Sequence, residues 1–494
     1  MVPVSPLLLG IRRDASTSLT SQLIHQIREA VLDGTLSAED RLPSTRDLAR
    51  RLRVSRNTVV AAYDALAADG TLVVQPRKGP RVARLHRRPS APSSAAAPAQ
   101  VPSRTARRLA ATIPDARLDA LIGRRARSRP FGAGLPDLEL FPMRAFERCL
   151  VRRWRAMSSA DALHDDPRGD LSLRRAVLRH IVPGRGIRTT VDQVFITEGA
   201  QGGLDLCCRS LLDATHTAWM ERPGPLALAA AIEMTGAKVI GVPVDANGMR
   251  VEHAIRHAPR ARVGFVSPAY AFPSGARLSL SRRMKLLEWA TRSGAAIVEI
   301  DYEGELSGDG ASATSLLGLD FDGANDCVIH VGSFSRSLFP ALRLGFVIVP
   351  RSLIRPFARV RAASTRSSPH AMQAALADFI EEGHWARHMR RLKQATRRRR
   401  ELVVAELRRL LPKGLAPRSP AGGATLTIDL PDHIDDVALA ARLAAAGVDV
   451  LPLGVGAGGP RNIGRGLVLG IGAHPESMLR RAAEQLATLV REAS

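Results

Sequence analysis

The stretch RLPSTRDLARRLRVSRNTVVAAYDALAADG, residues 41–70, decides the fold of the first part of this chain. Ser44 and Asp47 have the spacing of a capping box, which predicts the start of one helix, and Ser55 predicts the start of a second helix. The residues LRV (52–54) separate the two helical patterns. The apolar positions through which the second helix is expected to pack are Val59, Tyr63 and Leu66.

The sequence on both sides of this stretch extends the pattern. SLTSQLIHQIREAVLDG (18–34) has apolar residues on one helical face and ends at a glycine, so a further helix is expected there. TLVVQPRKGPRVARL (71–85) predicts two short strands around a basic turn. Three helices followed by a basic β-hairpin are typical of a winged helix-turn-helix, which we expect over residues 1–85.

The charge of the chain points to polyanionic partners. Its 494 residues carry a formal net charge of +24, and such a field raises the rate at which polyanions are encountered. The charge is uneven, because residues 1–130 hold 23 Arg and Lys against 10 Asp and Glu, an excess of 13. The winged helix is therefore expected to bind double-stranded DNA.

The start of the second helix of the motif suits base recognition. In a helix-turn-helix these residues face base edges in the major groove, where arginine and asparagine make paired hydrogen bonds to guanine and adenine. Phosphate contacts by other basic residues fix the position of the protein without reading sequence. The expected base-reading residues are Arg56, Asn57 and Thr58, and the expected phosphate contacts are Arg46, Arg50, Arg51 and Arg53 and, on the wing around Gly79, Arg77, Lys78 and Arg81.

Residues 41–70 closely resemble the winged helix of GntR-type regulators. The shared pattern is Arg-Leu-Pro-Ser, a leucine-alanine helix and a Ser-Arg-Asn-Thr recognition helix. Pro80 departs from the family, whose wing more often has a small polar residue there. The DNA contacts that the resemblance implies are Arg46, Arg56, Asn57 and Thr58, with the wing near Lys78 and Gly79.

Downstream, the composition changes twice. Residues 86–114 are rich in Pro, Ser, Ala and Arg without periodicity, which predicts a flexible linker. Beyond it, β-branched runs such as AAIVEID (295–301) alternate with helical patterns, so residues 115–494 are expected to form an α/β domain with a mostly parallel sheet. Its end, at about 390–494, is expected to form a smaller α+β subdomain. The run RRLKQATRRRR (390–400) predicts a solvated helix face, with DNA contact as the alternative.

No apolar stretch reaches the ~18 residues that a membrane helix needs, so we expect a cytoplasmic protein with no membrane partner. The cysteines lack metal-ligand spacing, and we expect buried thiols without disulfides and no metal site. They are Cys149, Cys207, Cys208 and Cys327.

Two segments of the α/β domain can form an anion site. TEGAQGG (197–203) follows an expected strand and opens an expected helix, whose first amides lie at the positive end of the helix dipole. GSFSRSLFPALRLG (332–345) adds hydroxyls and a guanidinium. The alternative is that the glycines serve only the turn and the arginine only a salt bridge. The groups expected in this anion cup are the amides around Gly199, Ala200 and Gln201, the hydroxyls of Ser333 and Ser335, and the guanidinium of Arg343.

Five motifs in family order resemble fold-type I aminotransferases as they are fused to GntR-type domains in MocR-type regulators. The resemblance implies that the lysine which forms a Schiff base with pyridoxal phosphate in the family corresponds to Arg336. A guanidinium stays protonated and cannot act as an amine nucleophile. The five motifs are FGAGLPDLELFP (131–142), DDPRGDLSLRRAV (165–177), TEGAQGGLDL (197–206), SPAYAFPSGARLSLSRRMKLLEWA (267–290) and SFSRSLFPALRLGFVIVP (333–350).

The resemblance implies further changes around the same pocket. The family aspartate that pairs with the pyridine nitrogen corresponds to Ile300, and Asp301 or Glu299 would replace it only after a register shift. Tyr302 is retained at the position that contacts the phenolic oxygen of the cofactor. The remaining changes are Pro225 in place of the ring-stacking aromatic, and Tyr270 and Ala271 in place of a His-Gln pair.

By resemblance, the chain is expected to be a bacterial, nucleoid-associated transcription regulator that binds operator DNA as a head-to-tail homodimer. Its aminotransferase-like domain, without catalytic residues, is expected to serve dimerisation and the sensing of a small anionic effector. No covalent cofactor is expected, whereas non-covalent pyridoxal phosphate or another small anion suits the cup. The alternatives are an active aminotransferase with an accessory DNA-binding domain and a purely structural pseudo-enzyme that binds no ligand.

Overall fold

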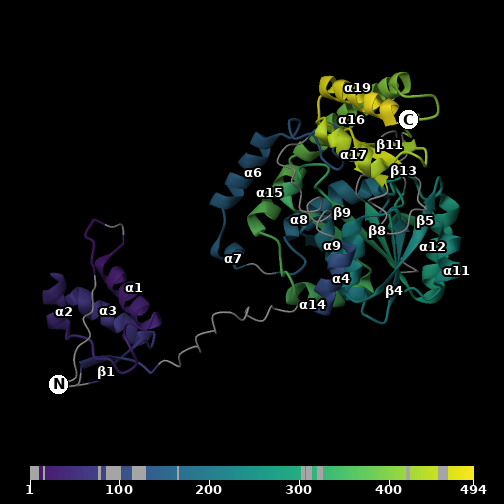
Figure 1. Cartoon of the computed structure of the whole chain (residues 1–494). Coiled ribbons are helices and arrows are strands. Elements are labelled where there is room, and N and C mark those ends of the chain that lie inside the picture. Colours follow the sequence, from purple (N-terminus) through teal and green to yellow (C-terminus); the bar gives the residue numbers. More distant parts are fainter. Residues whose placement is uncertain are drawn as a thin grey trace. The chain divides into compact units, whose positions relative to one another are not determined.

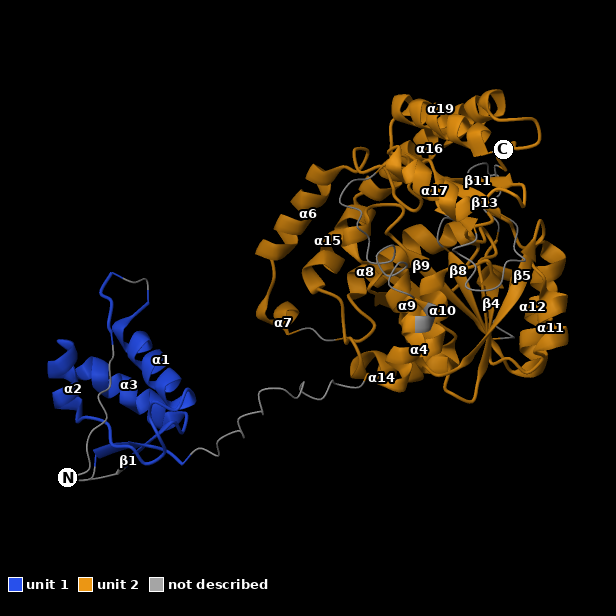
Figure 2. Ribbon diagram, viewed as in Figure 1, with its two compact units in different colours: residues 1–101 blue, residues 102–494 orange. Residues whose placement is uncertain are grey.

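The chain divides into two compact units, residues 1–101 and residues 102–494 (Figure 2). Each unit has its own hydrophobic core. The computed structural model describes residues 10–14, 17–75, 79–84, 102–113, 129–163, 166–301, 306, 314–319, 326–418, 423–453 and 465–493.

Unit 1 is the predicted winged helix. Its helices begin where the sequence places the caps, because the hydroxyls of Ser18, Ser44 and Ser55 each accept a backbone N–H three residues later. Their apolar faces meet in one core that also takes in both strands of the hairpin. The elements are α1 (Leu19–Leu32), α2 (Thr45–Leu52), α3 (Arg56–Ala68), β1 (Leu72–Gln75) and β2 (Gly79–Val82), the last two paired antiparallel.

Unit 2 is built on an eight-stranded sheet, as expected from its β-branched runs (Figure 1). The strands β4, β5, β7, β8 and β9 run parallel, while β10 and β6 pair antiparallel with their neighbours. The predicted mostly parallel α/β sheet is confirmed. In sheet order the strands are β3 (Val194–Thr197), β10 (Gly345–Ile348), β9 (Val328–Ser333), β8 (Ala296–Asp301), β7 (Val263–Val266), β4 (Thr217–Arg222), β5 (Lys238–Asp245) and β6 (Gly248–Met249).

Helices cover both faces of this sheet, so its strands are buried between two apolar layers. One face packs against α9 (Gly199–Leu211), α10 (Leu226–Met234) and α14 (Ile354–Ala363). The other packs against α11 (Val251–His257), α12 (Leu280–Ser293) and α13 (Leu316–Leu319). A third cluster beside β3 and β10 is formed by α6 (Met143–Arg155), α8 (Leu171–Ala176) and α15 (His370–Glu381).

The C-terminal part of unit 2 has a separate core around a three-stranded sheet. Phe131 packs into this core from far upstream in the sequence. The sheet is antiparallel, with β13 between β11 and β12. The elements are α16 (His384–Leu410), β11 (Thr425–Leu430), α17 (Asp436–Ala445), β12 (Leu451–Pro452), β13 (Arg465–Gly470) and α19 (Glu476–Ala493).

The stretch 86–114, expected to be a linker without regular structure, contains helix α4 (Arg104–Thr112). The hydroxyl of Ser103 accepts the amide of Ala106 and caps this helix, and α4 lies against α10 of unit 2. The expectation was wrong for this part because local capping and tertiary contact outweigh a low-complexity composition.

The cysteines are buried, and no helix in the described ranges is long and apolar enough to cross a membrane.

Candidate functional site

The first turn of α3 presents the expected base-reading residues. Arg56 and Asn57 are exposed, and within the described part of the chain their side chains make no hydrogen bond or ion pair. Thr58 is half-buried, and its hydroxyl lies 2.8 Å from the hydroxyl of the capping residue Ser55. Arginine and asparagine at the start of this helix are therefore available for contacts outside the protein.

A left-handed residue makes the turn between α2 and α3. Arg53 has φ 51° and closes α2, and its carbonyl accepts a hydrogen bond from the guanidinium of Arg13 at 2.7 Å. The hydroxyl of Tyr63 donates to the carbonyl of Pro43 at 3.0 Å, and burial raises the pKa of this phenol well above its ordinary value. The Tyr63 hydrogen bond holds α3 against the segment that precedes α2. Arg46, in the first turn of α2, is exposed.

The wing is only partly described. Gly79 begins β2 with φ 76°, a conformation that favours glycine. Arg77 and Lys78 lie outside the described residues. Arg81 is half-buried, with its side chain 24% exposed and its guanidinium 3.7 Å from a carboxylate oxygen of Glu39. Pro80 is buried and paired with Val74 across the hairpin.

In unit 2, the two segments of the expected anion cup meet at the start of α9. Gly199 has φ 73°, and a Cβ on it would lie 3.8 Å from the Oγ of Ser335. A Cβ on Gly345 would lie 2.9 Å from the Cα of Gly199, so this glycine allows the close approach. The hydroxyl of Ser333 accepts the amide of Ser335 at 3.2 Å and orders the loop.

The remaining cup residues divide between the protein interior and its surface. Ala200 is buried, and the side-chain amide of Gln201 donates from Nε2 to the carbonyl of Ala227 at 3.1 Å, which ties α9 to the start of α10. Arg343 follows a short 3-10 turn, η5 (Pro340–Leu342), in the left-handed conformation and is exposed. In the described ranges its guanidinium makes no hydrogen bond or ion pair, so it is available to an external anion.

A buried ion pair that the sequence did not reveal fixes the first residue before α9. Arg361 of α14 is 1% exposed and donates to both carboxylate oxygens of Glu198, at 2.6 and 2.7 Å. Ser368 adds a hydrogen bond at 2.9 Å. Burial by itself raises the pKa of Glu198, but Arg361 and Ser368 outweigh it and the net pKa is lowered. Glu198 and Arg361 are 163 residues apart in the sequence, so no local sequence pattern predicts their pairing.

Arg336 points toward the C-terminal part of unit 2. Its guanidinium carbon lies 5.4 Å from the centre of the Phe272 ring, and Nη2 lies 3.6 Å from where a Cβ on Gly134 would be. It lines a small cavity together with Leu392, Thr396, Ala424 and Gly472. The side chain thus extends away from the loop that carries it and into the contact between the two parts of the unit.

Strand β8 directs its two carboxylates, Glu299 and Asp301, to the face of the sheet opposite α9. Ile300 packs in the apolar cluster with α9, whereas Glu299 and Asp301 leave β8 in the opposite direction. Glu299 faces His330 at 3.2 Å, and Asp301 faces Arg185 at 2.9 Å. Burial raises the pKa of Glu299, but hydrogen bonds, first from His330, outweigh it and lower the net pKa.

The other positions singled out by the resemblance are built into the protein itself. Tyr302 lies outside the described residues. Pro225 precedes α10 and is half-buried. The hydroxyl of Tyr270 makes a short hydrogen bond to Thr425, and Ala271 is buried. Burial raises the pKa of Tyr270, against the opposing effect of Thr425 and of the positive charges of Arg336 and Arg400.

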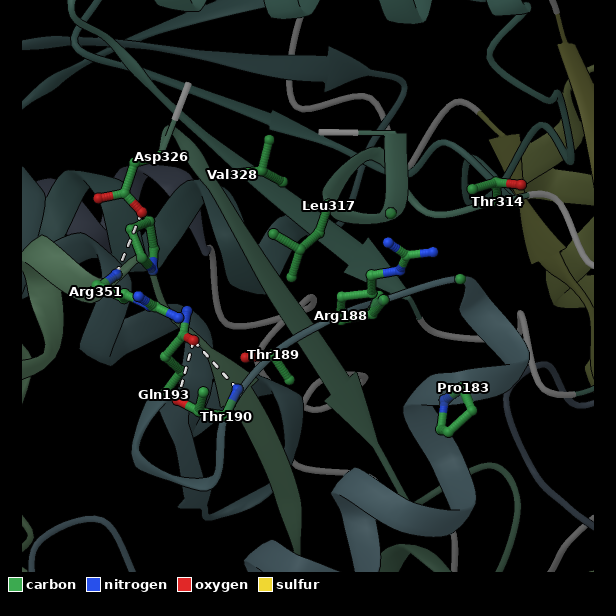
Figure 3. Close-up of a pocket in the computed structure, with 14 residues that line it drawn as sticks. Pro183, Arg188, Thr189, Thr190, Gln193, Thr314, Leu317, Asp326, Val328 and Arg351 are labelled. Atoms are coloured by element: carbon green, nitrogen blue, oxygen red, sulfur yellow. Dashed lines mark hydrogen bonds between the residues drawn. The ribbon is translucent and has the colours of Figure 1, made fainter. Parts of the chain in front are cut away.

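A further cavity, of about 1050 Å³, opens at the other end of the sheet (Figure 3). It lies at the amino end of β9, whereas the cup lies at the carboxyl end. Arg188 and Arg351 line it from different segments, and Asp326 accepts a hydrogen bond from the backbone amide of Arg351 at 3.2 Å.

No group of metal-ligating side chains occurs among the residues that the structure describes.

Comparison with known families assigns both units. Residues 19–82 match the gntR family of bacterial regulatory proteins, and residues 137–486 match aminotransferase class I and II. Among solved structures, the Pyrococcus horikoshii kynurenine aminotransferase has a TM-score of 0.68 at 24% identity and covers 80% of this chain and 95% of its own. An archaeal alanine:glyoxylate aminotransferase has a TM-score of 0.70 at 22% identity, covering 78% and 96%. These likenesses establish the fold of unit 2.

Full-length relatives combine the same two parts. The chain is 33% identical over 448 residues to the probable rhizopine catabolism regulatory protein MocR of Rhizobium meliloti, which covers 90% of this chain and 88% of the relative. It is 36% identical over 455 residues to the transcriptional regulator TauR of Rhodobacter capsulatus, covering 88% and 89%. It is 30% identical over 475 residues to the pyridoxine biosynthesis regulator PdxR of Corynebacterium glutamicum, covering 96% of each. The chain therefore belongs to the MocR-type family of gntR regulators that carry an aminotransferase class I and II domain.

Proposed function

We propose that this protein is a transcription regulator that binds operator DNA as a homodimer through its winged helix, and that its aminotransferase domain has lost catalysis. In this proposal, unit 2 holds the dimer together and senses a small anion. The cytoplasm, where the nucleoid lies, is the expected location. The observation that carries the loss of catalysis is Arg336 together with Ile300.

The DNA-binding role is supported by the unpaired side chains at the start of α3. Arg56 and Asn57 are exposed at the positions from which helix-turn-helix proteins contact base edges. Arg46, exposed on α2, suits a phosphate contact. Arg77 and Lys78, in the basic turn of the wing, are proposed phosphate contacts from the sequence.

The loss of a covalent cofactor is supported by the chemistry of the residues at hand. Pyridoxal phosphate supplies an electron sink when it is bound through an imine and has a charged partner at its ring nitrogen. Arg336 cannot form that imine. On the face of β8 toward α9 stands Ile300, while the carboxylates of Glu299 and Asp301 point the other way and already have partners. The residues therefore do not fit a working cofactor, and no catalytic step is assigned to them.

Sensing of an anion is supported by the groups that remain. The α9 amides after Gly199, the hydroxyl of Ser335 and the exposed guanidinium of Arg343 offer hydrogen bonds and positive charge. Arg336, whose guanidinium lies over the Phe272 ring, is a further proposed source of positive charge. A phosphate ester or carboxylate suits this set, including pyridoxal phosphate held without a covalent bond. Tyr302 is a further proposed contact.

The test combines spectroscopy and DNA binding on the full-length protein. Purified protein, incubated with pyridoxal phosphate and then dialysed, should show no imine absorption band, and borohydride should trap no adduct that mass spectrometry can detect. The same preparation should enrich a defined sequence from a pool of random duplexes. Transaminase turnover, or an adduct on any residue of the pocket, would favour the active aminotransferase instead. Failure to enrich any sequence would remove the regulator role.

A further inference from the structure

Helix α16 carries a disproportionate share of the positive charge of the chain. Its sequence, HWARHMRRLKQATRRRRELVVAELRRL, contains ten Arg and Lys residues against two Glu. The excess of eight is one third of the formal net charge of +24. The helix forms part of unit 2, so this charge is separate from that of the winged helix.

The arginines of α16 are sorted by helix face. At 100° per residue, the buried residues fall on one side, and a row of exposed arginines falls on the opposite side. The buried residues are His388, Met389, Leu392, Thr396, Arg399, Val403, Glu406 and Leu407. The exposed row, called here the arginine stripe, consists of Arg387, Arg390, Arg391, Arg397, Arg398, Arg408 and Arg409.

Most of the stripe is electrostatically uncompensated. Arg397 pairs with Glu401 at 3.0 Å and Arg409 with Glu406 at 2.8 Å. Arg387 donates to His384 and to a backbone carbonyl. In the part of the chain that the structure describes, no hydrogen bond or ion pair engages the guanidiniums of Arg390, Arg391, Arg398 and Arg408.

The surface helix α12 of unit 2 is arranged differently, because each of its cations has a partner. Arg282 pairs with Asp245 at 2.5 Å, Lys285 with Glu252 at 2.7 Å and Arg292 with Glu288 at 2.7 Å. Its fourth cation, Arg283, is buried and donates to backbone carbonyls. In α16, by contrast, Arg387 and Arg391 stand at i,i+4 with like charge, which is unfavourable unless an anion lies between or over them.

We propose that the arginine stripe is a second DNA-contacting surface, which binds the phosphates of the duplex beyond the bases contacted by the winged helix. This rests on the proposed DNA-binding function of unit 1 and extends it to unit 2. Each guanidinium can donate two hydrogen bonds to a phosphate without reading a base. Because both units belong to one chain, a duplex held by the winged helix reaches unit 2 at a high effective concentration.

The shape of the stripe favours duplex DNA over other polyanions. From Arg387 to Arg409 it runs along about 33 Å of helix at 1.5 Å per residue. That length matches roughly one turn of B-DNA, along which phosphates recur every ~3.4 Å on each strand. No aromatic residue interrupts the stripe to stack on unpaired bases, as single-stranded nucleic acids require. A second copy of the stripe would carry the same charge and repel it.

The experiment compares full-length variants on random-sequence duplexes of two lengths, about 20 and about 60 base pairs, the longer of which spans several helical turns. The stripe variant is Arg390→Gln/Arg391→Gln/Arg398→Gln/Arg408→Gln. The matched control removes four exposed, unpaired arginines elsewhere on unit 2: Arg256→Gln/Arg260→Gln/Arg355→Gln/Arg359→Gln. The dissociation constant is measured by fluorescence anisotropy over a range of salt concentrations.

The wild type should bind the long duplex more tightly and with a steeper salt dependence than the short one. The stripe variant should lose this difference, with the slope of log K against log salt falling by about 0.9 for each lost phosphate contact, up to ~4 in all. The control variant should behave like the wild type. Replacing the same four arginines by lysine should keep long-duplex binding within a few-fold, which separates charge from folding.

Three results would overturn the proposal: equal behaviour of the stripe and control variants, an unchanged salt slope in the stripe variant, or tighter stripe-dependent binding of single-stranded RNA than of duplex DNA. An Arg46→Gln/Arg51→Gln variant of unit 1 is measured in parallel. If it binds both duplexes like the wild type, the proposed function of the winged helix fails on its own. The stripe can then still be judged from its own variants.

Discussion

The guanidinium of Arg336 lies over the ring of Phe272, with its carbon 5.4 Å from the ring centre. A cation in this position is attracted by the face of the ring, and a partly desolvated pair of this kind contributes about 1–2 kcal/mol. The side chain therefore has a structural partner where a catalytic amine would need freedom to react.

Base reading by α3 can be separated from phosphate contact by α2. Arg56→Ala should weaken binding to the selected operator by about 1–3 kcal/mol while leaving non-specific binding nearly unchanged. Arg46→Ala should weaken both similarly and reduce the salt slope by about 1. Competition binding with mutated operators measures the difference, and equal loss of base discrimination in both variants would contradict the two roles.

The dimer should be held by unit 2. Exposed apolar side chains gather on and near α6 and the short helix α7 (Ser159–Ala162), with Trp154 67% and Leu163 83% exposed, and such surface is typical of an interface. Leu163→Arg should shift the protein toward monomer in sedimentation velocity. Leu32→Arg, at a 70% exposed leucine of unit 1, should not. A monomeric fragment 102–494 beside a dimeric fragment 1–85 would show that the winged helix holds the dimer.

The elements of this fold were largely predictable, because hydrophobic periodicity and capping residues are local. Ser44 and Ser55 cap the helices that the sequence assigns to them, and β8 and β9 fall on the β-branched runs. Contacts between distant segments were not predictable. The pairing of Arg361 with Glu198, and the turn of Arg81 toward Glu39, depend on which surfaces meet in three dimensions. Helix α4 was missed because its stability comes partly from α10.

Glu221 makes the stability of unit 2 depend on pH. It is 3% exposed near the end of β4, and burial raises its pKa from 4.5 to about 7, against a smaller opposing effect of Ser267. The folded state therefore holds a proton that the unfolded state releases, and stability falls as pH rises from about 4.5 to about 7. The full loss approaches ~3 kcal/mol.

Glu221→Gln removes this titration. The variant should melt at a higher temperature than the wild type at pH 8, and the advantage should shrink at pH 5, where both side chains are neutral. Differential scanning calorimetry at the two pH values measures it. An advantage of the same size at both pH values would mean that the glutamate is not protonated in the folded protein.

The ion pair that fixes the start of α9 should be worth far more than a surface pair. Arg361→Met leaves Glu198 half-buried without its cation, which should lower the free energy of unfolding by about 2–4 kcal/mol. The control is Arg209→Met, which removes an exposed arginine 2.7 Å from the half-exposed Asp205 on the same helix and should lower the free energy of unfolding by less than ~1 kcal/mol. Urea unfolding measures both, and equal effects would show that the buried pair is not a special support of the cup.

Restoring an amine at position 336 should not restore an enzyme. Arg336→Lys can at best form an imine with pyridoxal phosphate, because the ring nitrogen would still face Ile300 instead of a carboxylate, and the ring would lack a stacking aromatic at Pro225. We therefore expect an absorption band and a borohydride-stable adduct in this variant but no transaminase turnover above background. Adding Ile300→Asp should shift the band by stabilising the protonated ring nitrogen, while Arg336→Gln should give neither band nor adduct. Robust turnover in Arg336→Lys alone would mean that the pocket has kept the rest of its catalytic groups and that one substitution silenced it.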